Sequence, residues 1–257
     1  MFGIRIGFMT EYHGGVGLAA VMTAGALALA GCSSPSKAPA TSPATSTPTS
    51  AAPTSSQAAA PPTSTAPRVP EDRLGSFLLT ADEGNAIMGS TDMQDLGGLA
   101  TMDTNAFAVS NPDCLGAAHI VQPPVYSDSG YTAVKFDVLH KPGLRYTNSI
   151  EQALTTFPSA DQALAFVQTS AGKWKSCGGQ DVTESLNGGS TKWTFGNLVG
   201  DPPKISIIMN RHNARGYTCQ RVLSAVRNAV IDVKACAFKI SDQGVQAADK
   251  IAAKATQ

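Results

Sequence analysis

The chain has no excess of either charge. Its 257 residues include 19 Lys and Arg and 19 Asp and Glu, and charged residues make up 15% of the sequence, where about a quarter is usual. A sparse and balanced charge gives no general electrostatic attraction to nucleic acid or to an anionic membrane surface. We therefore expect no nucleic-acid partner.

Motifs of catalysis and metal binding are missing as well. The sequence contains no GxSxG, no HExxH, no Walker-type phosphate loop and no GxGxxG after a predicted strand. No two cysteines have CxxC spacing, and no histidine pair accompanies them. We expect no catalytic residue, no cofactor and no metal. An enzyme, such as an unrecognised hydrolase, is the least favoured class.

A long apolar run is also lacking. The stretch Val16 to Ala30 is apolar, but a helix needs about 20 such residues to span a bilayer, so its length is typical of a signal peptide. It ends in Leu29-Ala30-Gly31-Cys32, which resembles a bacterial lipobox. The resemblance implies that the Cys32 thiol is lipidated and that cleavage makes Cys32 the new N-terminus. Two or three acyl chains hold a protein stably on a membrane.

These patterns divide the chain into three parts. Residues 1–31 are predicted to be a lipoprotein signal peptide. Residues 32–70 are Cys32 and a tether rich in Ser, Thr, Pro and Ala, a composition that has too little apolar bulk to fold. Residues 71–257 are the folded domain. We expect the protein on the outer face of the cell membrane, held there by its lipid.

The folded part alternates strand and helix patterns. Helices are predicted near 81–89 and 160–175, each with capping-box spacing, and after Ser241 as the cap of a final helix. Residues 90–112 are expected to be irregular, apart from a short strand at 106–109. Alternating or apolar runs predict strands at 130–140, 146–158, 182–186, 191–198, 205–211, 217–226 and 230–238. The fold class is α+β, a single compact domain in which helices pack on an antiparallel sheet.

Five cysteines become four once Cys32 is lipidated, and an exported protein can form disulfides. Counting outward from a two-residue turn at Arg227-Asn228 places Cys219 directly opposite Cys236, within bridging distance. A turn with an odd number of residues would shift this register. By elimination Cys114 pairs with Cys177, closing a loop of about 60 residues that stabilises the domain by roughly 4 kcal/mol in the chain-entropy model. A redox pair or metal site is the alternative.

Other residues with functional chemistry have simpler explanations. His119, His140 and His212 are each a candidate general base, but packing or surface roles are favoured. The loop "RHNARGY", residues 211–217, is either an anion site or a solvated hairpin tip, and the tip is preferred. Trp174 continues the apolar helix stripe, and Trp193 alternates with a neighbouring aromatic residue. Both are predicted to be core residues rather than pocket residues.

The segments "LLTADEGNAIMG", "NPDCLGAA" and "FPSADQALAFVQTSAGKWKSCGG", followed by two late cysteines, resemble the PknH-like extracellular sensor domain family. The resemblance covers about residues 74–253, with Trp174 three residues before Cys177. It implies helices packed on an antiparallel sheet, two disulfides and a broad cleft for an unidentified extracellular ligand. No ligand-binding residue carries over. The family's kinase members also have a kinase domain and a spanning helix, which this sequence does not show, so it is not expected to transmit a signal by itself.

The favoured function is therefore a membrane-anchored binding module for a small molecule, a lipid or a cell-wall fragment. The alternative is a structural lipoprotein that docks on an envelope protein partner. A large cleft with apolar walls favours the first, and a flat exposed apolar patch favours the second.

Overall fold

The structure is a computed structural model that describes residues 67–105, 107–143 and 147–257. The predicted signal peptide, Cys32 and nearly all of the tether lie outside these residues. The described residues form nine strands in one antiparallel sheet, in the order β1-β3-β4-β9-β8-β7-β6-β5-β2. The strands are β1 (Gln94–Leu99), β2 (Ala108–Val109), β3 (Ala133–His140), β4 (Asn148–Thr156), β5 (Asp181–Leu186), β6 (Gly189–Phe195), β7 (Lys204–Arg211), β8 (Tyr217–Val226) and β9 (Ala229–Phe238).

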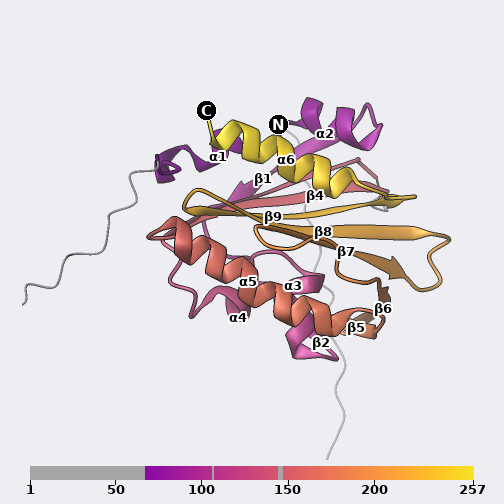
Figure 1. Cartoon of the computed structure of the whole chain (residues 1–257). Helices are drawn as coiled ribbons and strands as arrows, with labels where there is room; N and C mark the ends of the chain where they lie inside the picture. Colours follow the sequence, from indigo (N-terminus) through magenta and orange to yellow (C-terminus); the bar gives the residue numbers. More distant parts are fainter. Residues whose placement is uncertain (1–66, 106, 144–146) are drawn as a thin grey trace, which may run out of the picture. The chain divides into compact units, whose positions relative to one another are not determined.

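Helices cover both faces of the sheet (Figure 1). One face carries the 3₁₀ turn η2 (Pro112–Cys114) and the helices α3 (Leu115–Ala118), α4 (Pro123–Tyr126) and α5 (Ala160–Cys177). The opposite face carries the 3₁₀ turn η1 (Glu71–Arg73) and the helices α1 (Leu74–Phe77), α2 (Ala81–Met88) and α6 (Gln243–Ala255). The predicted α+β class with two disulfides is confirmed, as a sheet between two helical layers.

The alternation of side chains along β8 and β9 divides the core in two. One cluster lies under α5 and contains Trp174, Trp193, Phe195 and Met209. The other lies under α6 and contains Val222, Ile231 and Val233 among its members. Since successive residues of a strand point to opposite faces, Val222 and Leu223 of β8 lie in different clusters, as do Val230 and Ile231 of β9. The predicted core roles of Trp174 and Trp193 are confirmed.

The β8–β9 hairpin has the predicted register. Its two-residue turn is Arg227-Asn228, with Arg227 at a φ of 50°. Cys219 pairs with Cys236 across the strands, and their Cα atoms are 4.0 Å apart in the disulfide. The second disulfide joins Cys114 to Cys177, whose Cα atoms are 5.7 Å apart. Both predicted pairings are therefore present.

Two local predictions were wrong. Residues 94–99 form the edge strand β1, with a bulge between Asp95 and Gly98 where it pairs with β3, whereas the glycines in this stretch had indicated an irregular segment. Ser241 does not cap the final helix, because its hydroxyl donates to Asp242. The Gln220 side chain of β8 accepts from the backbone N–H groups of Gly244 and Val245, at 2.8 and 3.2 Å. A residue distant in sequence thus caps α6.

The first described residues are fixed to the central hairpin. The backbone N–H of Val69 donates to Asn228 Oδ1 at 2.7 Å, and Asn228 Nδ2 donates to the Phe157 carbonyl at 3.0 Å. Arg68 donates to the Pro158 carbonyl at 2.7 Å. The N-terminal end of the domain is therefore attached at the β8–β9 turn and at the end of β4.

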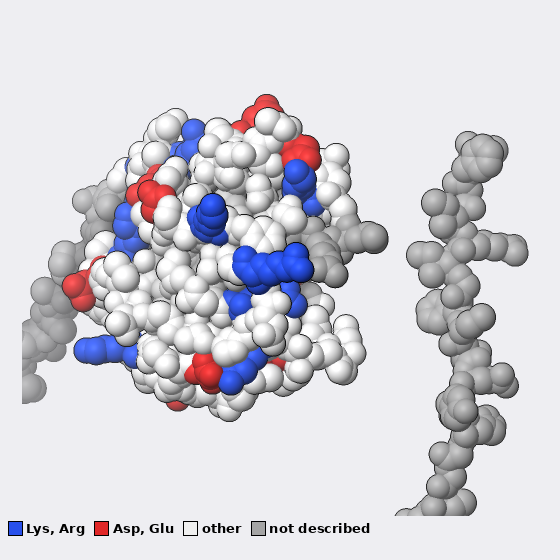
Figure 2. All heavy atoms as spheres, turned by 90° about the vertical axis from the view of Figure 1, so that its right-hand side faces the viewer, with Lys and Arg blue, Asp and Glu red and all other residues white. Residues whose placement is uncertain are grey.

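One end of the sheet is made by β7, β8 and β9 together. There β7 ends at Arg211, β8 begins at Tyr217 and β9 ends at Phe238. Figure 2 views the molecule from this side and shows Lys and Arg gathered in the middle of the face, with Asp and Glu nearer its margin.

Residues 67–257 contain every described strand, both core clusters and both disulfides. We therefore expect this fragment to fold by itself. None of the described helices combines the length and the apolar character that crossing a bilayer requires.

Candidate functional site

A groove runs between α4 and the outer face of α5. Its volume is about 360 Å³, within the range of small-molecule sites. The α5 side is a stripe at helical spacing that begins at Gln162 and ends at Lys173, about 16 Å apart along the axis at about 1.5 Å per residue. The α4 side consists of Pro124, Val125 and the following residues Asp128 and Ser129. The groove is therefore elongated, with one rigid wall.

The floor of the groove is apolar and its rim is polar. Val125 and Phe166 are half-buried and pack against the core beneath α5. Gln162, Thr169 and Lys173 are exposed along the rim. An apolar floor with a few polar groups at its edge suits a ligand that has both an apolar body and hydrogen-bonding groups.

A second, much smaller cavity lies directly behind this floor. It shares Val125, Phe166 and Ser170 with the groove. Its volume is about 10 Å³, which corresponds to roughly one water molecule. Its inner wall includes Arg221 and Asp232. Arg221 Nε is buried without a hydrogen-bond partner among the described residues, so this cavity is polar on its inner side.

Arg221 and Asp232 form a buried ion pair on the α5 face of the sheet. Their side chains are 1% and 2% exposed, and Arg221 Nη2 lies 2.6 Å from Asp232 Oδ1. Asp232 Oδ2 also accepts from the Val121 backbone N–H at 3.0 Å and from the Tyr126 hydroxyl at 2.9 Å. The Arg221 guanidinium stacks over the Trp174 ring at 5.2 Å. Because these contacts join the sheet, α4 and α5, they hold the groove walls in place.

The Tyr126 hydroxyl is held in its neutral form. Burial raises its pKa well above the usual value, and the nearby Asp232 carboxylate raises it further. Tyr126 therefore remains a hydrogen-bond donor to Asp232 at any physiological pH.

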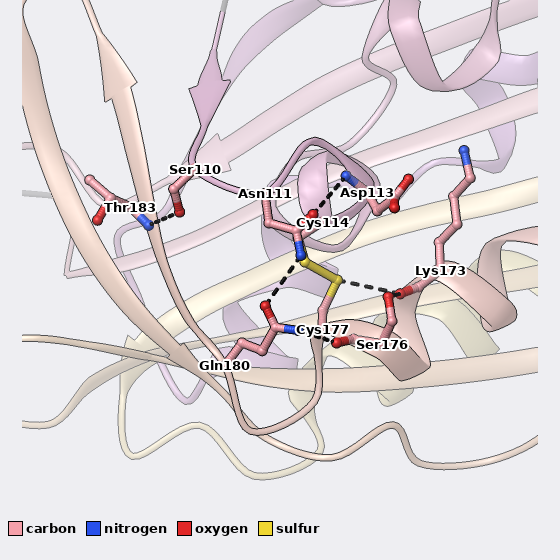
Figure 3. The surroundings of a disulfide bond; sticks show 9 residues. All are labelled: Ser110, Asn111, Asp113, Cys114, Lys173, Ser176, Cys177, Gln180 and Thr183. Atoms are coloured by element: carbon pink, nitrogen blue, oxygen red, sulfur yellow. Dashed lines mark hydrogen bonds between the residues drawn. A yellow bond between two sulfur atoms is a disulfide. The ribbon is translucent and has the colours of Figure 1, made fainter.

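The far end of α5 is fixed by the Cys114–Cys177 disulfide (Figure 3). Around it, Asn111 Oδ1 accepts from the Asp113 N–H at 3.2 Å, and Asn111 Nδ2 donates to Gln180 Oε1 at 3.2 Å. Both cysteines are fully buried. The disulfide thus ties η2, which leads into α3 and α4, to the C-terminal end of the helix that forms the other groove wall.

The three candidate histidines lie apart, each held by its own contacts. His119 is buried, stacks on Phe107 with ring centroids 3.7 Å apart, and places Nε2 2.9 Å from Glu184 Oε2. His212 Nε2 lies 2.7 Å from Thr194 Oγ1. His140 Nδ1 lies 2.7 Å from the Lys141 carbonyl oxygen. A shared catalytic arrangement of the three is not formed.

The His119–Glu184 pair has perturbed acid–base properties. Burial lowers the pKa of His119, and the positive charge of Lys234 lowers it further, against the opposing effect of Glu184. For Glu184, burial raises the pKa, but hydrogen bonding to His119 and the charge of Lys234 outweigh it, so that the net pKa is lowered. At neutral pH the favoured state is a neutral imidazole beside a carboxylate.

No group of three or more His, Cys, Asp or Glu side chains within residues 67–105, 107–143 and 147–257 is arranged to hold a metal ion.

The loop 211–217 forms the β7–β8 turn. Its His212 contacts β5 through Asp181, whose Oδ1 lies 3.4 Å from His212 Nε2. The lipidation prediction for Cys32 falls on residues that the structure does not describe.

The sequence did not reveal the groove. Its α5 wall lies beside the predicted core stripe of Ala163, Val167, Ser170, Ala171 and Trp174. The one available signal was Phe166, a large apolar residue outside that stripe. Val125 lies in a Pro-rich stretch with no helical period, so its position opposite Phe166 depends on the tertiary structure.

Comparisons with known proteins identify the family and a solved structure with a similar fold. Residues 69–254 match the family described as "PknH-like extracellular domain". The chain is 44% identical over 186 residues to serine/threonine-protein kinase PknH of Mycobacterium tuberculosis, and equally to PknH of Mycobacterium bovis. These matches cover 72% of this chain, but only 30% and 31% of the two kinases. The crystal structure of the extracellular domain of PknH from Mycobacterium tuberculosis matches with a TM-score of 0.72 and 43% identity, covering 74% of this chain and 97% of that one.

Proposed function

The chain belongs to the PknH-like extracellular domain family, and on that premise we propose that it is a binding module that captures a small extracellular ligand in the α4–α5 groove. The kinases named above are much longer than the matched region, so their catalytic activity is no part of the proposal. The match to an extracellular domain supports an exported protein whose folded part faces outward.

The observation that carries the proposal is a groove that is formed before any ligand binds. Its α4 wall is held through Tyr126 and Val121 to Asp232, and its α5 wall is held by the disulfide and by Trp174 on Arg221. A preformed site loses less conformational entropy on binding than one that must be ordered. The rigidity of this groove therefore favours ligand capture.

The ligand class follows from the lining. An apolar floor at Phe166 and a rim that carries both Asp128 and Lys173 suit an elongated amphipathic molecule. A lipid or a cell-wall fragment with hydrogen-bonding groups has this character.

Filling the groove tests the proposal. Ala165 lines the groove and is exposed, whereas Gln168 is exposed on the same helix but does not line it. Wild-type residues 67–257, Ala165→Trp and Gln168→Trp are incubated with an extract of the cell envelope, and retained small molecules are identified by mass spectrometry. We expect a compound that wild type and Gln168→Trp retain and Ala165→Trp loses. Retention of the same compound by all three proteins, or no retained compound at all, would refute the proposal.

We further propose that Cys32 is lipidated, with residues 1–31 as signal peptide, 32–70 as anchor and tether, and 71–257 as the ligand-binding domain. The support is the lipobox-like sequence Leu29-Ala30-Gly31-Cys32. The intact mass of protein extracted from the membrane should correspond to a chain that begins at an acylated Cys32. A mass without acyl groups would contradict the anchor.

A binding module is favoured over an enzyme because the histidines are committed to other contacts. His119 is packed between Phe107 and Glu184, and His212 bonds to Thr194. Neither lines the groove.

One observation favours docking on an envelope protein as a second candidate. The edge strand β1 is exposed along its length, and Leu96 and Leu99 are 55% and 47% exposed. An exposed edge strand can pair with a strand of another protein. Leu96→Lys should abolish such a complex without affecting ligand capture, and cross-linking in the native envelope measures this.

A further inference from the structure

Three aromatic side chains and one cationic side chain form a row across four neighbouring strands at one end of the sheet. Trp193 of β6 pairs with Arg211 of β7, and Tyr217 of β8 pairs with Phe238 of β9. Asn210 pairs with Thr218, so the next position along places Arg211 opposite Tyr217. The Tyr217 and Phe238 rings are in edge contact, with centroids 5.6 Å apart.

Two further cations lie beside this row. Arg215 is in the β7–β8 turn, and Lys239 directly follows Phe238 at the end of β9. Both are exposed, and neither side chain has a hydrogen bond or an ion pair with another described residue. We call Arg211, Arg215, Phe238 and Lys239 the basic–aromatic end.

Two carboxylates near this end, Asp181 and Glu151, form ion pairs with other residues. Asp181 lies 2.8 Å from Lys192 and 3.4 Å from His212. Glu151 Oε1 lies 3.8 Å from Lys234 Nζ. Among the residues that the structure describes, Arg211, Arg215 and Lys239 form no ion pair with a carboxylate, and Figure 2 shows Lys and Arg gathered on this side of the molecule.

An apolar side chain is exposed among these cations. Phe238 is 48% exposed and stands at the outer end of its strand. None of Arg211, Arg215, Phe238 and Lys239 lines the groove or the small cavity described above. The basic–aromatic end thus presents a surface with an exposed aromatic ring and is not part of either cavity.

We propose that the basic–aromatic end docks on the surface of an anionic phospholipid bilayer. Arg211, Arg215 and Lys239 would contact lipid phosphates, and the Phe238 ring would insert between the headgroups and the acyl chains. The balanced charge of the whole chain, 19 positive and 19 negative residues, predicts no attraction to such a surface. The attraction comes from the local placement of three cations around one exposed ring.

Vesicle binding tests this proposal. Residues 67–257 are mixed at low ionic strength with phosphatidylcholine vesicles that contain phosphatidylglycerol, and with vesicles of phosphatidylcholine alone, and the bound fraction is measured by sedimentation. We expect binding only to the anionic vesicles. Arg215→Gln combined with Lys239→Gln should weaken it about 25-fold, since each cation near an anionic surface contributes about fivefold in affinity.

The matched control removes the same charge at other surfaces. Lys175 and Lys250 are exposed on α5 and α6, and Lys175→Gln with Lys250→Gln should leave vesicle binding unchanged. Phe238→Ala should weaken binding at high as well as low salt, because insertion of a ring is not screened by salt. Thermal unfolding of each variant establishes that the fold is retained, which is expected for exposed positions.

Three results would overturn the proposal. The first is no binding of the wild-type fragment to the anionic vesicles. The second is an equal loss for the control variant, which would indicate diffuse charge attraction. The third is binding of the fragment to a soluble polyanion but not to vesicles, which would indicate that the partner is an anionic polymer and not a bilayer.

Discussion

Removing the charge of Asp232 should destabilise the domain far more than removing an exposed carboxylate. In Asp232→Asn the shape of the side chain is nearly kept, but the Arg221 guanidinium, which is 1% exposed, loses its counter-ion. A buried charge without a partner is unfavourable because the protein interior solvates it poorly. The perturbation therefore acts mainly through Arg221.

The magnitude follows from the contacts that remain. Breaking a buried ion pair from one side costs about 3–5 kcal/mol. Arg221 keeps hydrogen bonds to the carbonyls of Gly116 and His119, at 2.8 and 3.3 Å, and its stacking on Trp174. We therefore expect the lower end, a loss of about 3 kcal/mol in the free energy of unfolding, out of the roughly 5–15 kcal/mol that is typical of a domain.

The exposed pair Lys204–Asp249 provides the control. Its atoms are 2.7 Å apart, but the side chains are 39% and 55% exposed, so Asp249→Asn should cost at most about 0.5 kcal/mol after solvent screening.

Urea unfolding of oxidised residues 67–257 measures both variants, and linear extrapolation gives each free energy. Equal losses for the two variants, or a loss for Asp232→Asn below about 1 kcal/mol, would show that the buried pair does not hold the groove walls as we infer.

Three further predictions concern the fold. The lowered pKa of His119 means that the unfolded chain binds more protons near the ordinary value of 6.5, so stability should fall as the pH drops through that region, and His119→Gln should flatten this dependence in urea unfolding. Gln220→Ala should cost about 1–2 kcal/mol by uncapping α6, and Gln220→Glu should restore most of it because the acceptor is kept; an unaffected Gln220→Ala protein would contradict the cap. Replacing Cys114 and Cys177 by serine should cost about 4 kcal/mol, against about 3 for Cys219 and Cys236, since the loops span 63 and 17 residues; the reverse order in thermal melting would rule out the loop-entropy explanation.

Local sequence patterns were sufficient to predict most strands of the sheet. The two-residue turn at Arg227-Asn228 fixes the register of its hairpin, and that register alone places Cys219 opposite Cys236. The long helix was predicted from a capping residue and an apolar stripe, and Ser159 indeed accepts from the Gln162 N–H at 3.2 Å. These features depend on residues close together in the sequence, or on a single hairpin.

Features that depend on distant partners could not be predicted. Gln220 caps a helix that begins more than 20 residues later, and Asp232 accepts from Val121, which lies 111 positions away. Neither residue type indicates its partner. The groove has the same origin, because its walls come from α4 and α5, which no local pattern brings together. β1 was missed because Gly97 and Gly98 are poor strand formers, and pairing with β3 outweighs that preference.

The attachment of Val69 to Asn228 decides how a mechanical pull on the preceding chain would act. Tension would enter the domain through Arg68 and Val69, which bond to the end of β4 and to the turn of the central hairpin. Only these few hydrogen bonds resist the pull at first, so they would break one after another. The strand pairing of β4, β8 and β9, whose strands are nine or ten residues long, would not yet carry the force. A pull on the preceding residues would thus release only the first residues of the domain and leave the sheet, the disulfides and the groove intact.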